Sequence, residues 1–323
     1  MQGIDGASIL RADEVEYQGW EKVFRLCNDT VQLIILTQVG PRILSFGFRG
    51  EHNEFYENPA HAGKRGGADY RVYGGHRLWV SPEVDCTYYP DNFPVSVRRL
   101  KDAFIFTAPP ESHPETKLQK EIEVKLAVTG AHVSITHRIT NVGKQTAEIA
   151  PWALSVMAGS GKAILPLPPR AAPSKDRLLP EGVFALWSWT DLADPRWAFG
   201  TNYIQLQQGS NSACRFNEQM GGIYNPFGWG AYFRQGHLFV KKVEVQKGAK
   251  YPDFGCNFEV YTDSCSLELE TLGPLQDLEP EQTAEHTEEW WLFKDIPAGK
   301  DETWIDSVVL KIVEMIEPTV LRS

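Results

Sequence analysis

Short segments in which apolar and polar residues alternate run through most of the chain. Residues 121–126 and 132–140 are clear examples, with apolar side chains at every second position over most of their length. Successive side chains of a strand point to opposite faces of a sheet, so this period of two predicts β-strands. Composition and turn signals predict further strands at residues 31–36, 103–107, 204–206, 237–245, 257–261, 266–270 and 288–293.

Helix signals are few, and the predicted strands follow one another without helical crossovers. Such a succession predicts mainly antiparallel sheets stacked face to face. We therefore expect an all-β chain folded as one large antiparallel β-sandwich. Residues 304–315 fit either a closing strand or a short helix, because their apolar spacing does not distinguish the two.

A proline-rich stretch at residues 165–173 interrupts the strand pattern. Proline cannot donate a ladder hydrogen bond, so we expect a surface excursion here and not a central strand. The stretch is also the best candidate for a domain boundary. Strand spacing is similar on its two sides, and we predict a single domain over residues 1–323.

Composition and charge narrow the class of ligand. The chain has 323 residues, 42% of them hydrophobic, and a formal net charge of −10. That profile is typical of an ordinary globular protein, and it argues against a nucleic-acid surface, which needs clustered lysine and arginine. A neutral or modestly polar small molecule is the expected partner.

The cysteines and the termini bear on compartment. The five cysteines are scattered and form no C-x-x-C pair, which predicts neither a disulfide framework nor a thiolate zinc site: Cys27, Cys86, Cys214, Cys256 and Cys265. The first twenty residues have no apolar core of a signal peptide, and no apolar run is long enough to span a membrane. We expect a cytoplasmic protein without a membrane partner. Exposed sheet edges permit a homodimer without requiring one.

Histidine spacing gives no sign of a metal site. His132 and His137 are five residues apart on one predicted strand and point to opposite faces, so they cannot share an ion. No aspartate-rich loop suggests calcium. No metal or other cofactor is predicted.

Four segments, in order, resemble the galactose-mutarotase-like superfamily, which includes aldose 1-epimerases and hexose-6-phosphate epimerase relatives. They are Gly40 to Phe46, Gly74-Gly75-His76-Arg77-Leu78-Trp79 with Pro82-Glu83, His137 to Gly143, and Leu267-Glu268-Leu269-Glu270-Thr271 with Glu289-Trp290-Trp291. The resemblance spans roughly residues 30 to 295. It implies the β-supersandwich of that family, with a sugar site in a shallow cleft on one sheet.

The resemblance also implies residue roles. Mutarotases open and reclose a pyranose ring with a carboxylate base and a histidine acid, because each proton transfer needs its partner at neutral pH. The base corresponds to Glu270 or, with a two-residue shift, to Glu268. The family's acid histidine follows the asparagine-glycine hairpin, but this chain has Ala150-Pro151-Trp152-Ala153-Leu154 there. Standard mutarotase catalysis is therefore in question, and His76 is the candidate for a replacement acid.

Further residues are candidates for binding the sugar. Around His76, the segment is dense in polar and aromatic side chains, so Arg77, Trp79 and Glu83 are expected to bind hydroxyls or stack on a sugar face. A tight turn with Trp79 in the core is the alternative interpretation. Other expected contacts are Trp152, Lys241, Asp253, Glu259 and Glu268, and the tryptophans in segments 184–189 and 225–230 are expected near a cleft.

Three functions are compatible with these observations. The first is a carbohydrate-binding protein with aldose 1-epimerase-like activity, in which Glu270 is the base and His76 the acid. The second is a non-catalytic sugar-binding or regulatory module. The third is a uronate lyase, favoured if Lys241 and Arg77 face the cleft together. All three depend on one expectation: that the His76 segment and the Glu270 strand converge on a shared hollow.

Overall fold

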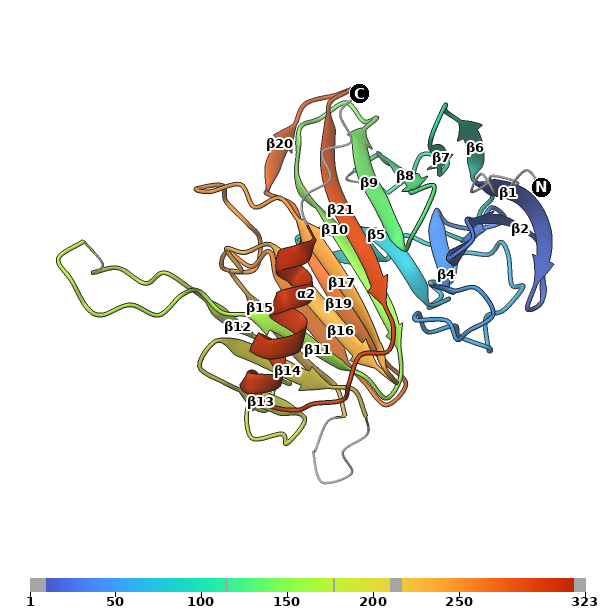
Figure 1. Ribbon diagram of the computed structural model, residues 1–323. Coiled ribbons are helices and arrows are strands. Elements are labelled where there is room, and N and C mark those ends of the chain that lie inside the picture. The colour runs from blue at the N-terminus through green and yellow to red at the C-terminus, as the bar shows by residue number, and fades with distance from the viewer. Residues whose placement is uncertain (1–9, 114–115, 177, 210–216, 317–323) are drawn as a thin grey trace, which may run out of the picture.

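A computed structural model describes residues 10–113, 116–176, 178–209 and 217–316 (Figure 1). Within these residues the chain forms two large antiparallel sheets, one of eleven strands and one of ten. The predicted all-β antiparallel sandwich is confirmed. The first sheet holds β1 (Arg11–Tyr17), β2 (Trp20–Cys27), β3 (Val31–Leu36), β4 (Arg42–Phe48), β5 (Gly75–Ser81), β10 (Ala147–Ala158), β19 (Ser266–Leu272), β18 (Phe258–Thr262), β15 (Gln219–Ile223) and β12 (Phe184–Leu186), in that order, with β20 (Gln276–Leu278) beside β10. The second sheet holds β13 (Trp197–Phe199), β14 (Tyr203–Gln207), β11 (Lys162–Pro166), β16 (Trp229–Arg234), β17 (His237–Val243), β21 (Thr283–Phe293), β9 (His132–Asn141), β8 (Leu118–Leu126), β7 (Phe104–Thr107) and β6 (Ser96–Arg99).

The main core lies between the two sheets. In β8 and β9, buried and half-buried residues alternate along the whole strand, as a period of two requires. Phe46 of the first sheet, for example, meets Phe239 and Trp290 of the second sheet, with ring centroids 6.2 and 6.0 Å away. Burial of this apolar surface provides the main driving force for stacking the sheets.

The C-terminal segment is helical, which settles the choice between strand and helix. Asp301 caps its start by accepting a hydrogen bond of 2.9 Å from the backbone N–H of Trp304. The helix runs through α1 (Glu302–Trp304), a wider turn η2 (Ile305–Val309) and α2 (Leu310–Met315). Trp304, Ile305, Val309 and Val313 pack on the outer face of the second sheet, so the helix covers that face (Figure 1).

The proline-rich stretch requires a partial correction. Its first two residues, Leu165 and Pro166, belong to β11, which lies between β14 and β16. Pro166 is tolerated because β11 pairs with β16 only as far as Ile164, and Pro166 faces Tyr203 of β14 alone. Residues 169–176 are exposed, as expected for an excursion. In each sheet, strands that precede the stretch are hydrogen-bonded to strands that follow it, β10 to β19 in the first sheet and β9 to β21 in the second.

The outer face of the first sheet carries a different set of residues. Its centre holds a cluster of buried side chains that face away from the main core: Trp79, Trp152, Leu154, Met220 and Leu272. Tyr70, Trp187, Trp189 and Tyr261 pack around them. This face contains the aromatic and acidic side chains that the sequence marks as candidates for binding.

No disulfide bond links the cysteines of the described residues. Cys27, Cys86, Cys256 and Cys265 are free thiols, and Cys214 lies outside the described residues. No helix in the described part of the chain is long and apolar enough to cross a membrane.

Candidate functional site

A cleft of about 450 Å³ lies on the outer face of the first sheet, above β5, β10 and β19. Its size falls within the range of small-molecule pockets. The aromatic part of its lining consists of Tyr56, Tyr70, Trp79, Tyr88, Trp152, Trp189 and Tyr261. Its carboxylate part consists of Glu83, Asp263, Glu268 and Glu270. The cleft is thus lined by flat rings and hydrogen-bond acceptors together.

The strand register explains why these side chains meet. Trp79 of β5 pairs with Trp152 of β10, which pairs in turn with Leu272 of β19. Glu270 lies two residues before Leu272, and Glu268 lies two residues before Glu270. Alternation therefore places Glu268, Glu270 and Leu272 on the same face as the two tryptophans. The His76 segment and the Glu270 strand do converge, through Trp79, Glu83 and Glu270.

Glu270 is the central acid of the cleft. Its side chain is buried, with the residue only 1% exposed. Its Oε2 accepts a hydrogen bond of 2.7 Å from the indole Nε1 of Trp152, while its Oε1 has no hydrogen-bond partner among the described residues. Burial, followed by the charge of neighbouring Glu268, raises the pKa of Glu270 well above its usual value. This shift favours the protonated form of Glu270.

Glu268 lies next to Glu270 and is half-buried. Burial raises the pKa of Glu268 to about 7, and the nearby positive charge of Arg77 opposes this rise. The two carboxyl groups interact, so a proton on one affects the other. Glu268 is close to its midpoint near pH 7, and the raised pKa of Glu270 favours its protonated form. Such a pair can both give and accept a proton.

Two predicted acids, Glu259 and Asp253, do not line the cleft but lie near this pair. Glu259 of β18 is paired in register with Glu270 and is fully buried. Its carboxyl group interacts with that of Asp253, which lies on a turn with a φ of 49° and is half-buried. Burial, then the charges of Glu270 and Asp253, raises the pKa of Glu259 well above normal. These acids act on the cleft through Glu270.

The aromatic wall is built from rings that pack against one another. Trp79 contacts Trp152 and Tyr88 edge to face, each with ring centroids 5.2 Å apart. Arg77 does not line this cleft and lies against the wall instead: its guanidinium carbon is 4.4 Å from the centroid of Trp79 and 5.1 Å from that of Tyr70. Its Nη1 donates a hydrogen bond of 2.6 Å to the Tyr70 hydroxyl. The predicted role of Arg77 as a direct ligand of the sugar is thus replaced by support of the wall.

His76 is not in the cleft, and this corrects its predicted role as the acid. It lies on the opposite face of β5 from Trp79, buried between the two sheets with 0% exposure. Its Nδ1 is 2.9 Å from Oγ of Ser155, and its Nε2 is 2.7 Å from Nε2 of His137. Burial lowers the pKa of His76 well below normal. A neutral histidine enclosed between the sheets cannot protonate a sugar bound on the other side of β5.

The tautomers of this buried network follow from its acceptors. Nδ1 of His137 donates to the backbone carbonyl of His286, at 2.9 Å, so its Nε2 is an acceptor. His76 must then donate from Nε2, which leaves its Nδ1 to accept from the Ser155 hydroxyl. Burial lowers the pKa of His137 and of His286 to about 3. All three histidines are therefore neutral at neutral pH.

Lys241 is also between the sheets, contrary to its predicted place in the cleft. Its Nζ is 2.8 Å from Oε1 of Glu288 and donates to the backbone carbonyl of Leu269 at 2.9 Å. Glu288 further accepts a hydrogen bond from the indole of Trp290 at 2.7 Å and one from the hydroxyl of Thr271. Lys241 and Glu288 form a buried ion pair beneath β19. Lys241 and Arg77 do not face the cleft together.

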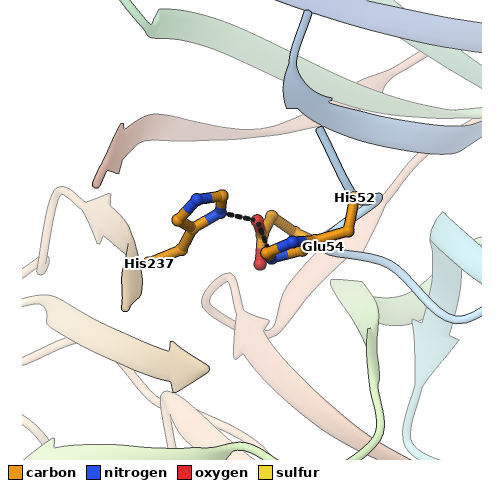
Figure 2. A group of neighbouring side chains, drawn as sticks. All are labelled: His52, Glu54 and His237. Atoms are coloured by element: carbon orange, nitrogen blue, oxygen red, sulfur yellow. Dashed lines mark hydrogen bonds and ion pairs between the residues drawn. The ribbon is translucent and has the colours of Figure 1, made fainter. Parts of the chain in front are cut away.

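Histidines that showed no ligand spacing do come together in the fold. Figure 2 shows His52, Glu54 and His237, in which Oε1 of Glu54 is 2.6 Å from Nδ1 of His237 and 3.2 Å from Nε2 of His52. The two rings are stacked, 4.2 Å apart and inclined by 20°. The lone pair of an imidazole nitrogen lies in the ring plane, so one ion bound by both rings would have to lie in two nearly parallel planes that are separated by the stacking distance. As they stand, they do not converge on one tetrahedral ion.

A second group joins His76, His137 and Glu288. The distance of 2.7 Å between the two Nε2 atoms fits a hydrogen bond and is short for two ligands of one ion. The ammonium of Lys241 already neutralises Glu288. Both histidine groups are therefore accounted for by hydrogen bonds and ion pairs within the chain.

Sequence reasoning missed several lining residues. Tyr70 and Tyr88 lie in irregular or short helical segments. Alternation of apolar and polar residues does not indicate there which side chains point toward the cleft. Tyr261 could have been found, because it follows Glu259 by two residues on β18 and so shares its face. Trp189 does line the cleft, as expected for its segment, whereas Trp229 lies under the C-terminal helix on the second sheet.

Comparison with known proteins bears on the fold. No family model matches the sequence, and none of the curated proteins resembles it closely. A galactose mutarotase-like protein from Lactobacillus casei matches with a TM-score of 0.52 at 8% identity, over 84% of this chain and 100% of its own. A galactose mutarotase-like protein from Clostridium acetobutylicum matches with a TM-score of 0.50 at 9% identity, over 88% of this chain and 99% of its own.

A longer protein is also similar. A TPR-domain containing protein from Parabacteroides distasonis matches 98% of this chain with a TM-score of 0.58 at 12% identity. This chain spans 56% of the length of that protein. Likeness at such low identity identifies the architecture and not the activity. The chain has the galactose mutarotase-like β-sandwich fold.

Proposed function

We propose that the chain binds a monosaccharide in this cleft and interconverts its α and β anomers, as an aldose 1-epimerase does. The observation that carries the proposal is the pair Glu268 and Glu270. Glu270 is buried, directs an unpartnered oxygen at the cleft, and lies beside a carboxyl group with a pKa of about 7. Acid–base catalysis at neutral pH requires groups with this property.

The rest of the lining supports a sugar as the ligand. Flat aromatic faces pack against the C–H surface of a pyranose, and carboxylates accept hydrogen bonds from its hydroxyl groups. The indole Nε1 atoms of Trp79 and Trp189 are buried in the wall and have no acceptor among the described residues. Buried polar groups are normally hydrogen-bonded, so these two donors are suited to hydroxyl oxygens of a ligand.

The proposed reaction transfers two protons. Ionised Glu268 takes the proton of the anomeric hydroxyl, and protonated Glu270 gives its proton to the ring oxygen. The bond between the anomeric carbon and the ring oxygen breaks, which yields the open-chain aldehyde. Rotation about the adjacent carbon–carbon bond and reversal of both transfers close the ring as the other anomer. No net proton is gained or lost.

This assignment reverses the role that the resemblance gave to Glu270. The reason is the surroundings of each group: Glu270 is buried beside the charge of Glu268, which raises its pKa and favours its protonated form, so we assign it as the acid. Glu268 is half-buried and near the positive charge of Arg77, which favours its ionised form, so we assign it as the base. Trp152 occupies the place where a histidine acid was expected, and it binds Glu270 instead of replacing the acid.

NMR of anomeric exchange tests the proposal. Freshly dissolved α-aldoses are followed with and without protein, using wild type, Glu270→Gln and Glu268→Gln. We expect wild type to accelerate exchange and each glutamine variant to lose about 100-fold or more of that acceleration. Glu148→Gln is the matched control, because Glu148 lies on β10 in the same sheet but is exposed and pairs only with exposed Lys250. No acceleration by wild type would contradict the proposal.

A non-catalytic sugar-binding module is the second candidate. One observation favours it: the expected histidine position is filled by Trp152. Binding of a sugar without accelerated exchange would identify this function. The condition that favoured a uronate lyase is not met, because Lys241 lies between the sheets.

A further inference from the structure

The charged groups that line the cleft are all of one sign. Glu83, Asp263, Glu268 and Glu270 contribute carboxyl groups, and no lysine, arginine or histidine lines the cleft within the described ranges. A phosphate or carboxylate group on a ligand would face only acids there. Like charges in a partly buried site repel strongly because solvent screens them poorly.

Arg77 does not offset the negative charge of the cleft. Arg77 lies behind Trp79 and Tyr70, and its Nη1 is held by the Tyr70 hydroxyl at 2.6 Å. Its charge helps to ionise Glu268, since it lowers the pKa of that group against the effect of burial. Arg77 therefore favours negative charge in the cleft while remaining outside it.

The aromatic lining adds to the preference for a cation. The face of an indole or phenol ring carries negative electrostatic potential, which attracts ammonium and guanidinium groups. The protein already uses this wall in that way, because the guanidinium of Arg77 lies 4.4 Å from the ring centre of Trp79. Trp152, Trp189 and Tyr261 offer further rings to a ligand in the cleft.

One buried atom has no partner that the chain supplies. Oε1 of Glu270 finds no donor among the described residues, although Glu270 is only 1% exposed. Because Oε2 accepts from Trp152, Oε1 holds the proton of the acid and suits an acceptor on the ligand, while an ammonium group, with three donors and no acceptor, complements the carboxyl groups of Glu83 and Glu268 beside it. A hydroxyl group has only one hydrogen to donate to these carboxyl groups.

From these observations we infer that the ligand of the cleft is an amino sugar bound as its protonated ammonium form, in preference to neutral, phosphorylated or uronic acid sugars. This inference rests on the proposed function, because it names the substrate class of the same site. The ammonium lies by the carboxyl groups of Glu83 and Glu268, which leaves the proton of Glu270 for the ring oxygen, and the sugar ring lies against the tryptophans. Binding of the cation favours the ionised form of Glu268, whose pKa is about 7, so affinity rises as the pH increases toward 7.

Calorimetric titration of the full chain tests the inference. The ligands are glucosamine, its 3-amino and 6-amino isomers, glucose, glucose 6-phosphate and glucuronate, at pH 6.5 and low salt. We expect at least one amino sugar to bind about tenfold or more tightly than glucose, with both anionic sugars weaker than glucose. Glu83→Gln is expected to lower this preference for an amino sugar over glucose several-fold. Glu148→Gln should not change it.

The outcomes separate the two proposals. Equal affinity for glucose and every amino sugar, or tighter binding of glucose 6-phosphate or glucuronate, overturns the inference and leaves the proposed function standing. Failure of all the sugars to bind overturns the proposed function itself. A preference for amino sugars that survives in both Glu83→Gln and Glu268→Gln also overturns the inference, because the carboxylates would then not be its source.

Discussion

The indole N–H of Trp152 donates a hydrogen bond of 2.7 Å to one carboxyl oxygen of Glu270 and leaves the other oxygen facing the cleft. This contact orients the acid and, by stabilising its ionised form, lowers a pKa that burial raises. Trp152 thereby acts as a positioning residue. The cleft combines such oriented acids with an aromatic wall on one face of the first sheet.

Trp152→Phe tests this positioning. The substitution keeps an aromatic ring but removes the donor, so the pKa of Glu270 should rise further. We expect the alkaline limb of the rate–pH profile for anomer exchange to move to higher pH. The free energy of unfolding should fall by about 1–2 kcal/mol, the usual contribution of such a bond. An alkaline limb that stays in place would show that Trp152 has no influence on the acid.

The acids of the cleft should make the protein less stable as the pH rises. The pKa of Glu268 is about 7 in the folded chain, against 4.5 for an ordinary glutamate, and that of Glu270 is raised further. Above pH 4.5 the folded state therefore holds protons that the unfolded chain has released, and stability falls with pH through this interval. Below pH 4.5 both states are protonated and the effect vanishes.

Buried His137 and His286 act in the opposite direction, because they must remain neutral in the fold and ionise in the unfolded chain below pH 6.5. The comparison must therefore be between variants. The advantage of Glu270→Gln over wild type in free energy of unfolding should increase from pH 5 to pH 8 in urea denaturation. A difference that is constant or shrinks would contradict the raised pKa.

His76→Ala tests the placement of His76 between the sheets. Loss of the ring breaks its contacts with Ser155 and His137 and leaves a cavity, at a cost of about 2–4 kcal/mol in free energy of unfolding. Catalysed exchange by the folded variant should stay within a few-fold of wild type. If the variant does not fold, imidazole ¹⁵N shifts of wild type give the answer, since burial lowers the pKa of His76 and its ring should stay neutral well below the pH at which an exposed histidine ionises. A folded variant without activity would restore His76 as the acid.

Lys241→Met tests the buried ion pair. Removing the ammonium leaves Glu288 charged and enclosed between the sheets, which should cost about 3–5 kcal/mol in free energy of unfolding. Adding Glu288→Gln should recover a large part of this loss, because no unpaired charge then remains. Urea denaturation of the two variants and wild type gives the comparison. A single variant as stable as wild type would mean that the pair is not enclosed.

Alternation was sufficient to predict half-buried strands such as β8 and β9, but it did not predict β5 and β10, which are buried along almost their whole length. It was weaker on which face of a strand meets the cleft. In β5, His76 shares its face with Leu78 and Val80. Alternation along the strand, considered by itself, would therefore have predicted that His76 lies in the core. The polar neighbours His76 and Arg77 obscured that signal. Lys241 was expected to point inward and does, but the inward side proved to be the space between the sheets.

Long-range groupings could not be read from the sequence. His52 and His237, or His76 and Glu288, come together only after distant strands have paired in register. The pKa of Glu268 depends equally on neighbours such as Arg77, which is almost two hundred residues away in the chain. By contrast, the spacing of Glu268 and Glu270 was local and gave their common face correctly.

Indole N–H resonances in protein labelled with ¹⁵N-tryptophan test the central claim most directly, because they report which tryptophans meet a sugar. Trp79 and Trp189 lie in the cleft wall with unpartnered N–H groups, whereas the N–H groups of Trp290 and Trp304 are bonded to Glu288 and Pro297 away from it. On titration with an amino sugar or aldose that binds, the Trp79 and Trp189 signals should shift and those of Trp290 and Trp304 should not. Shifts confined to Trp290 or Trp304, or none with any sugar, would contradict the account.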